Sequence, residues 1–139
     1  MVYSKLKTLA HNMKNREAQT SIQYQIPTLT WRLFFGWIFR RYHRHTITGD
    51  SMLPTLNSAD QILIDKRRSA LRTLQPFDVV CFTHPTHSKL VLIKRIKSIN
   101  RQTQEYIVLG DNLIKSTDSR HFGSIKKNAL LGRVVCRFN

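Results

Sequence analysis

Short runs of β-branched and aliphatic residues, separated by turn-forming residues, fill the chain after residue 45. Such runs are typical of strands, and the Pro, Gly, Asn and Asp clusters between them are typical of turns. The predicted strands cover residues 61–65, 78–83, 89–99, 105–110 and 130–138. No internal repeat is visible, so the pattern predicts a mainly β fold, one compact domain of twisted, mostly antiparallel strands.

The first 45 residues have a different pattern. Residues 1–27 are polar and basic, whereas between residues 29 and 42 aromatic and aliphatic side chains recur at helical spacing. We therefore expect a basic arm and a short amphipathic helix over residues 1–45, followed by the β domain over residues 46–139. Two interpretations of the helix stay open: it packs on the domain, or it binds a membrane surface or a partner.

The most apolar segment, residues 29–39, is about half as long as the roughly 20 residues that a spanning helix needs. It also contains Arg32 and lacks the features of a secretory signal. We expect no spanning helix, and a cytoplasmic protein that contacts a membrane peripherally through residues 29–42.

The net charge of +15 departs furthest from an ordinary composition. A field of this sign favours polyanions, anionic membrane surfaces or acidic proteins, without choosing among them. Cys81 and Cys136 are the two cysteines of the chain. Two cysteines do not make a disulfide framework, so we expect both to be reduced and buried on strands.

The segment "KLVLIKRIKSI", residues 89–99, places a lysine in an apolar row. With a period of two, Lys94 shares one face with Leu90, Leu92 and Ile96. Burial disfavours the ammonium form, and lowering a lysine pKa from about 10.4 to about 7 requires roughly 4 to 5 kcal/mol. The product is a neutral amine that accepts a proton. A lysine that snorkels from a sheet edge is the alternative.

The segment "GDSMLPTLN" raises the question of whether Ser51 is a nucleophile or an ordinary turn serine. Pro54 restricts Leu53 to extended geometry, and Gly49 allows close approach of another backbone. A serine after such a turn can present its hydroxyl and its own N–H to a substrate carbonyl. A plain turn serine remains the alternative.

A third polar segment, "VLGDNLIKSTDSRHFGSI", covers residues 108–125. Asp118 and Arg120 are spaced for a charge-assisted pair that fixes a loop. Taken alone, this segment also fits a structural loop with satisfied hydrogen bonds.

In chain order, "GDSMLPTL", "LIKRI" and "LGDNLIKSTDSRHFG" resemble the successive motifs of the signal peptidase I family of serine proteases, and "LLGRVV" resembles that family's closing strand. The resemblance covers residues 45–138. It implies a catalytic domain of coiled antiparallel sheets and a serine endopeptidase that needs no metal or organic cofactor.

The resemblance also implies a role for each matching residue. Ser51 is the expected nucleophile and Lys94 the expected general base. Ser116 matches the serine that orients the lysine, and Asp118 and Arg120 match a pair that stabilises the site. The implied reaction is acyl transfer through an acyl-enzyme.

Further positions match the cleft and the oxyanion hole, with two departures. Met52 and Pro54 match residues that shape the substrate cleft. Gly49 stands where some members carry a serine that completes the oxyanion hole with the N–H of Ser51, so the second donor is unassigned. The common "GDNRDxS" reads "GDNLIKS" here, which predicts different packing over residues 113–115.

The lead-in "FFGWIFRRYHRHTITGDSMLPTL" and the segment "THPTHSKLVLIKRI" resemble the nickel-type superoxide dismutase maturation proteases, a subgroup thought to remove a short N-terminal presequence. The expected partner is therefore a precursor protein with such a presequence. General signal peptidases and mitochondrial-type presequence peptidases are the runner-up.

Two other classes of protein each share a feature with this sequence. Self-cleaving repressors also use a Ser/Lys dyad, and a net charge of +15 would suit DNA binding. They also need a helix-turn-helix region that residues 1–45 do not offer, so no nucleic-acid partner is expected. A structural zinc site built on Cys81, His84 and His87 is the other alternative.

Overall fold

The computed structural model describes residues 26–28, 30–31 and 42–138. The basic arm and most of the amphipathic helix expected over residues 29–42 lie outside these residues, so the helix and the division at residue 45 stay predictions. Within the described part of the chain, no helix has the length and apolar character that crossing a membrane requires.

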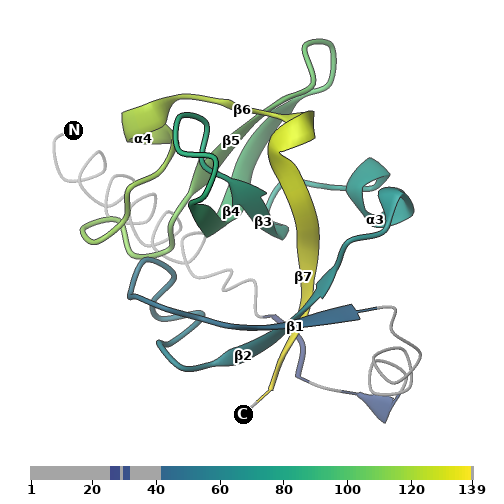
Figure 1. Ribbon diagram of the computed structural model, residues 1–139, viewed down its shortest axis with the longest axis vertical. Coiled ribbons are helices and arrows are strands. Elements are labelled where there is room, and N and C mark those ends of the chain that lie inside the picture. Colours follow the sequence, from purple (N-terminus) through teal and green to yellow (C-terminus); the bar gives the residue numbers. More distant parts are fainter. Residues whose placement is uncertain (1–25, 29, 32–41, 139) are drawn as a thin grey trace, which may run out of the picture.

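Seven strands form one curled antiparallel sheet, which confirms the predicted mainly β fold (Figure 1). The strands are β1 (Tyr42–Thr46), β2 (Gln61–Asp65), β3 (Val79–Thr83), β4 (Val91–Asn100), β5 (Glu105–Leu109), β6 (Ile125–Lys126) and β7 (Leu130–Phe138). Their order across the sheet is β1-β2-β7-β3-β4-β5-β6. The helical segments are α3 (Arg68–Arg72), α4 (Ser119–Phe122) and the 3₁₀ turn η1 (Lys127–Ala129).

The central strand β3 separates two hydrophobic cores. Its residues Val79 and Cys81 belong to one core, and Val80 and Phe82 belong to the other. Successive side chains of a strand point to opposite faces, so both faces of β3 are covered. The curl of the sheet supplies the cover, because β1 and β2 lie below the upper strands β3 to β6 and β7 runs between the two groups (Figure 1).

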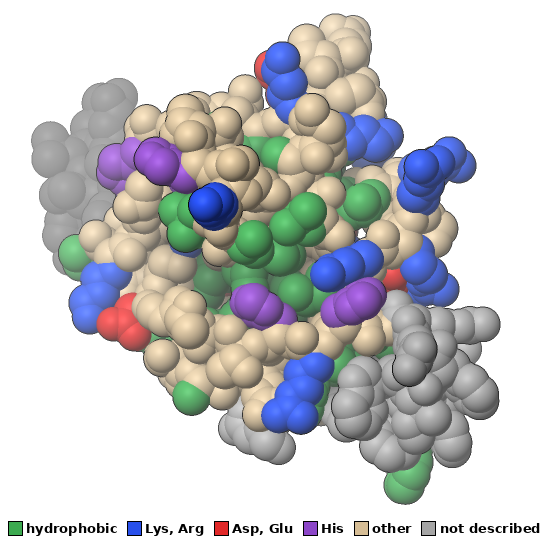
Figure 2. Space-filling view, in the orientation of Figure 1, with side chains coloured by type: hydrophobic (Ala, Val, Ile, Leu, Met, Phe, Trp, Pro, Cys, Tyr) green, Lys and Arg blue, Asp and Glu red, His purple; other side chains and the backbone are tan. Residues whose placement is uncertain are grey.

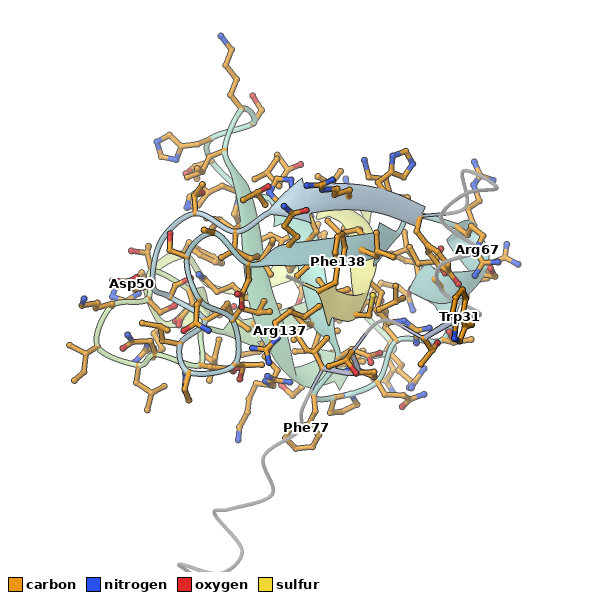
Figure 3. The ribbon with its side chains drawn as sticks, turned by 90° about the horizontal axis from the view of Figure 1, so that it is seen from below. Trp31, Asp50, Arg67, Phe77, Arg137 and Phe138 are labelled. Carbon is orange, nitrogen blue, oxygen red and sulfur yellow. The ribbon has the colours of Figure 1, made fainter. Side chains whose placement is uncertain are left out.

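The described N-terminal residues run beside the end of β7. Thr28 pairs with Arg137 in a parallel bridge, and the Arg137 N–H donates to the Pro27 carbonyl at 3.0 Å. Ile26 packs against the core that contains Val79. Figure 3 places Trp31 at the end of the molecule opposite Asp50, the neighbour of Ser51. The N-terminal segment therefore reaches the far end of the domain from the serine turn.

Candidate active site

Ser51 lies in the loop that joins β1 to β2. Two backbone bonds close the base of this loop: Ile47 N–H donates to Asp60 O at 2.8 Å, and Ala59 N–H donates to Ile47 O at 3.0 Å. The side chains of Met52 and Leu56 are buried in the core below it. The loop is thus anchored at its base and along its length, which fixes the position of Ser51.

Gly49 precedes this turn with φ of +90°. Residues with a side chain rarely adopt this left-handed backbone conformation, whereas glycine adopts it without steric cost. A Cβ atom at this position would meet nothing within 4 Å. The preference for glycine here is therefore one of backbone conformation and not of crowding.

Lys94 lies on β4 opposite Val80 of β3, and its Nζ is 2.5 Å from the Ser51 Oγ. Its exposed fraction is 2%, which confirms the buried position predicted from the strand period and makes the snorkelling alternative wrong. Burial lowers the pKa of Lys94, and the nearby carboxylates of Asp118 and Asp111 oppose this only in part. The structure therefore joins a hydroxyl to a desolvated amine from segments 43 residues apart.

The Asp118 carboxylate is fully buried and organises the loop between β5 and β6. Arg120 forms the predicted pair with it, from Nε to Oδ1 at 2.9 Å and from Nη2 to Oδ2 at 2.9 Å. Oδ2 also accepts from Gly110 N–H at 2.9 Å and from Ser116 Oγ at 2.7 Å. Burial by itself raises the pKa of Asp118, but these hydrogen bonds outweigh it and hold the pKa well below its usual range.

Ser116 is buried beside this carboxylate, and its hydroxyl donates its proton to Asp118. The resemblance assigned it to Lys94 as an orienting partner, and that role stays a prediction. A Cβ at Gly110 would lie 2.2 Å from Ser116 Oγ and 2.5 Å from the Ser51 carbonyl oxygen. Gly110 thus lets Ser51 and Ser116 pack against one backbone position, a role that the sequence did not indicate.

A second ion pair next to the lysine was missed by the sequence reasoning. Arg95 donates to Asp111 from Nε at 2.8 Å and from Nη2 at 2.6 Å, with both side chains about 15% exposed. Its Nη2 also donates to Thr55 Oγ1 at 3.2 Å, on the serine loop. A planar guanidinium suits such a bidentate contact. The pair therefore links β4, the serine loop and the loop after β5.

Two further contacts hold the loop after β5 against the serine turn. Asn112 N–H donates to Ser51 O at 3.0 Å, and Lys115 Nζ pairs with Asp50 Oδ2 at 2.9 Å. Leu113 and Ile114 project into solvent, with exposed fractions of 61% and 96%. The distinctive "LIK" segment therefore places a lysine on the serine turn and two apolar side chains at the loop surface.

The cleft residues predicted from the resemblance lie in different environments. Met52 is 2% exposed and belongs to the core, whereas Pro54 is at the surface. Figure 2 shows hydrophobic side chains gathered in a hollow between β1 and the strands β3 and β4. A cleft role for Met52 and Pro54 stays a prediction.

The two cysteines are free and buried, as predicted, and Cys81 does not lie together with His84 and His87. Cys81 and Cys136 are free and buried, and burial raises the pKa of the Cys81 thiol to about 11. Across the described residues there is no group of three or more His, Cys, Asp or Glu side chains able to hold a metal ion. Cys81 lies in a core, apart from the turn that carries His84 and His87.

Comparison with known proteins agrees with this fold. The family model described as signal peptidase, peptidase S26, matches residues 22–103 and 97–139. Signal peptidase I V of Bacillus subtilis (strain 168) is 24% identical over 63% of this chain and 80% of its own length. Mitochondrial inner membrane protease subunit 1 of Schizosaccharomyces pombe is 31% identical over 65% of this chain and 69% of its own length. Mitochondrial ATP-independent inner membrane protease subunit 1a of Arabidopsis thaliana is 30% identical over 66% of this chain and 67% of its own length.

The curled antiparallel sheet and these relatives define the class of protein, a serine endopeptidase. The chain belongs to the signal peptidase family, peptidase S26.

Proposed function

We propose that Ser51 is the nucleophile and Lys94 the general base of a peptidase that removes N-terminal presequences from precursor proteins. The observation that carries this proposal is the 2.5 Å contact between Lys94 Nζ and Ser51 Oγ at a buried position. A serine hydroxyl is a weak nucleophile without a neighbouring base, and a lysine becomes a base only when desolvation lowers its pKa.

The reaction has two acyl-transfer steps. Neutral Lys94 takes the proton of the Ser51 hydroxyl as Oγ attacks the scissile carbonyl, and it then gives the proton to the leaving amine. The products of this step are an acyl-serine and the mature protein's free N-terminus. Lys94 next takes a proton from water, which attacks the ester; it then returns this proton to Ser51 Oγ as the ester C–O bond breaks and the presequence leaves with a new carboxylate.

The oxyanion is stabilised at the serine turn in this proposal. The N–H of Ser51 is one donor, and the backbone at Gly49 borders the position of the second. The φ of +90° favours glycine at position 49, which therefore has no hydroxyl of its own, and we assign the second donor to a backbone N–H.

Ser116, Asp118 and Arg120 support the dyad in this proposal. Asp118 is held by Arg120 and Gly110 and accepts from Ser116, so the Ser116 oxygen keeps lone pairs that can accept from Lys94. Asp118 also acts on the pKa of Lys94 through its charge.

For the substrate, we propose a nickel-type superoxide dismutase precursor. The support is the resemblance of the arginine-rich lead-in and of residues 83–96 to that subgroup. The second candidate is a general signal or mitochondrial-type presequence, supported by relatives named signal peptidase I V and inner membrane protease. Those relatives also support peripheral membrane contact, which we assign to residues 29–42.

The test incubates the purified full chain with both precursors and identifies the products by mass spectrometry. We expect cleavage of the dismutase precursor after its presequence, and no cleavage by Ser51→Ala, Lys94→Ala or Lys94→Arg. Arginine is the informative replacement, because a guanidinium keeps its proton and cannot serve as a base. Full activity of any of these variants would refute the dyad.

Two outcomes separate the substrate from the chemistry. Cleavage of generic signal sequences but not of the dismutase precursor would support the second candidate and leave the dyad intact. Self-cleavage of the chain incubated alone would instead indicate the repressor class of Ser/Lys proteases.

A further inference from the structure

The turn between β3 and β4 brings two imidazoles together. His84 and His87 occupy the first and last positions of the turn "HPTH", in which His87 N–H donates to His84 O at 3.3 Å. His84 N–H also donates to Leu90 O at 2.8 Å, and Leu90 N–H donates to His87 O at 2.9 Å. Pro85 at the second position fixes its own φ and favours the turn. The backbone therefore holds both side chains in place.

The two rings meet through one nitrogen of each. The Nδ1 atoms of His84 and His87 are 3.2 Å apart, with ring centroids at 4.8 Å and planes inclined by 66°. The His84 ring also packs edge-on against Phe122 of α4, at a centroid distance of 4.9 Å. This contact fixes the orientation of one ring from outside the turn.

The hydrogen bonds around these nitrogens indicate where their protons lie. Thr86 N–H donates to His84 Nδ1 at 3.2 Å, so this nitrogen carries a lone pair and the neutral ring is protonated at Nε2. Thr86 Oγ1 lies 2.9 Å from His87 Nδ1. Thr86 Oγ1 also lies 3.2 Å from His84 Nδ1, so both nitrogens have hydrogen-bond partners within the turn. Each imidazole nitrogen has one lone pair, so a bound cation would displace the Thr86 N–H and hydroxyl from these nitrogens and would require both rings to be protonated at Nε2.

From this juxtaposition we propose a site for a late first-row divalent cation, such as Ni²⁺, Zn²⁺ or Cu²⁺, bound by His84 Nδ1 and His87 Nδ1. Imidazole nitrogens suit these ions, and they bind at about 2.0–2.1 Å. Two nitrogens 3.2 Å apart at such distances from one ion subtend about 100°, between the octahedral and tetrahedral angles.

The site has two protein ligands and open positions. No third His, Cys, Asp or Glu joins the two histidines within the described part of the chain, so water or an exogenous donor completes the coordination. A pocket of about 520 Å³ that includes His84, Ser88 and Lys126 opens beside it. The ammonium of Lys126 favours an anionic co-ligand there. This site goes beyond the proposed peptidase reaction and does not depend on it.

The test titrates NiCl₂ into the full chain and follows heat and two-dimensional amide NMR spectra. We expect one ion per chain, with paramagnetic broadening that starts at residues 83–90. His84→Ala and His87→Ala should each weaken the affinity at least tenfold.

The controls use the chain's other candidate ligands. Cys81→Ser tests the Cys-His-His alternative and should leave the affinity unchanged. The pair His43 and His45 on β1 supplies the same number of imidazoles, and no contact between those two rings is found among the described residues. Binding that survives the double variant His84→Ala/His87→Ala, or that is lost with His43→Ala/His45→Ala instead, would overturn the proposal, as would the absence of saturable binding. Unchanged circular dichroism of each variant confirms that it is folded.

Discussion

A buried lysine beside a serine hydroxyl is the residue-scale feature on which the proposed chemistry depends. Burial lowers the pKa of Lys94 from its ordinary value of 10.5, and the charges of Asp118 and Asp111 raise it in part. The neutral amine is the reactive form, so the free enzyme gains activity as the pH rises through the pKa of Lys94. The plateau is therefore reached below the pH range in which an exposed lysine loses its proton.

Asp111→Asn should shift this pH profile towards lower pH. The substitution removes a negative charge that favours the ammonium form of Lys94, so the amine becomes neutral at a lower pH. The measurement is kcat/KM against pH for the wild type and the variant. Asp50→Asn is the matched control, because Asp50 pairs with exposed Lys115 and its charge is not among the causes of the Lys94 shift. An equal shift in both variants would contradict the assignment of Asp111.

Gly110→Ala should reduce kcat at least tenfold as well as stability. The added Cβ would lie 2.2 Å from Ser116 Oγ and 2.5 Å from the Ser51 carbonyl, so the two segments must move apart. Gly132→Ala is the comparison, because the nearest atoms that its Cβ would meet belong to Ile64, Asp65 and Lys66 and not to Ser51, Lys94 or Ser116. Both variants should lower the melting temperature, and only Gly110→Ala should lower kcat of the folded enzyme. Equal kcat values would show that Gly110 has no special place in the site.

At the scale of elements, the loop from β5 to β6 is organised by one buried carboxylate. Asp118 caps α4 by accepting from Arg120 N–H, and His121 completes a capping box. The same carboxylate binds the side chains of Ser116 and Arg120. A helix of four residues has little stability of its own, so this charge holds the loop in place.

This charge predicts a loss of stability in acid. The folded-state pKa of Asp118 is depressed, so its contribution is present above the unfolded-state value of about 3.9 and is lost as the pH falls below it. The free energy of unfolding of the wild type, measured with urea, should therefore fall as the pH is lowered from about 5 to about 2. Asp118→Asn should cost about 2 kcal/mol at pH 7 and reduce this pH dependence. Unfolding with the same pH dependence in Asp118→Asn would contradict the argument.

Much of the element pattern could be predicted, and the exceptions have a common cause. The five predicted strands match β2, β3, β4, β5 and β7 within two residues at each end. β1 and β6 were missed because both lie at the edges of the sheet and carry little apolar alternation: four of the five residues of β1 are exposed. Edge strands bury less surface, so the hydrophobic pattern that predicts a strand is weaker in their sequences.

The site residues could be predicted only where the pattern within a single segment indicates burial or pairing. The strand period indicated the burial of Lys94, and the spacing of Asp118 and Arg120 indicated their pair. The contact of Arg95 with Asp111 and Thr55 joins three segments, and it depends on how the sheet curls. No local pattern contains that information.

At the scale of the whole molecule, the excess of basic residues has no place in the acyl-transfer chemistry. There are 23 Lys and Arg residues against 8 Asp and Glu residues. In Figure 2 the Lys and Arg side chains are spread around the visible face. A charge of +15 distributed in this way favours association with anionic surfaces.

The variant Ser51→Ala, which we expect to be inactive, should sediment at low salt with vesicles that contain anionic lipid. It should be released near 1 M salt, where the Debye length is about 3 Å. Vesicles of neutral lipid should retain little protein at either salt concentration.

The segment that makes the contact can be tested with two matched variants. If residues 29–42 make it, Arg40→Gln/Arg41→Gln should weaken binding more than Lys126→Gln/Lys127→Gln. The second variant removes the same charge from the opposite half of the chain. Equal weakening would assign the binding to net charge alone, because a diffuse field depends on how many charges are lost and not on which ones. Retention by neutral vesicles at high salt would contradict an electrostatic origin and indicate insertion of apolar side chains.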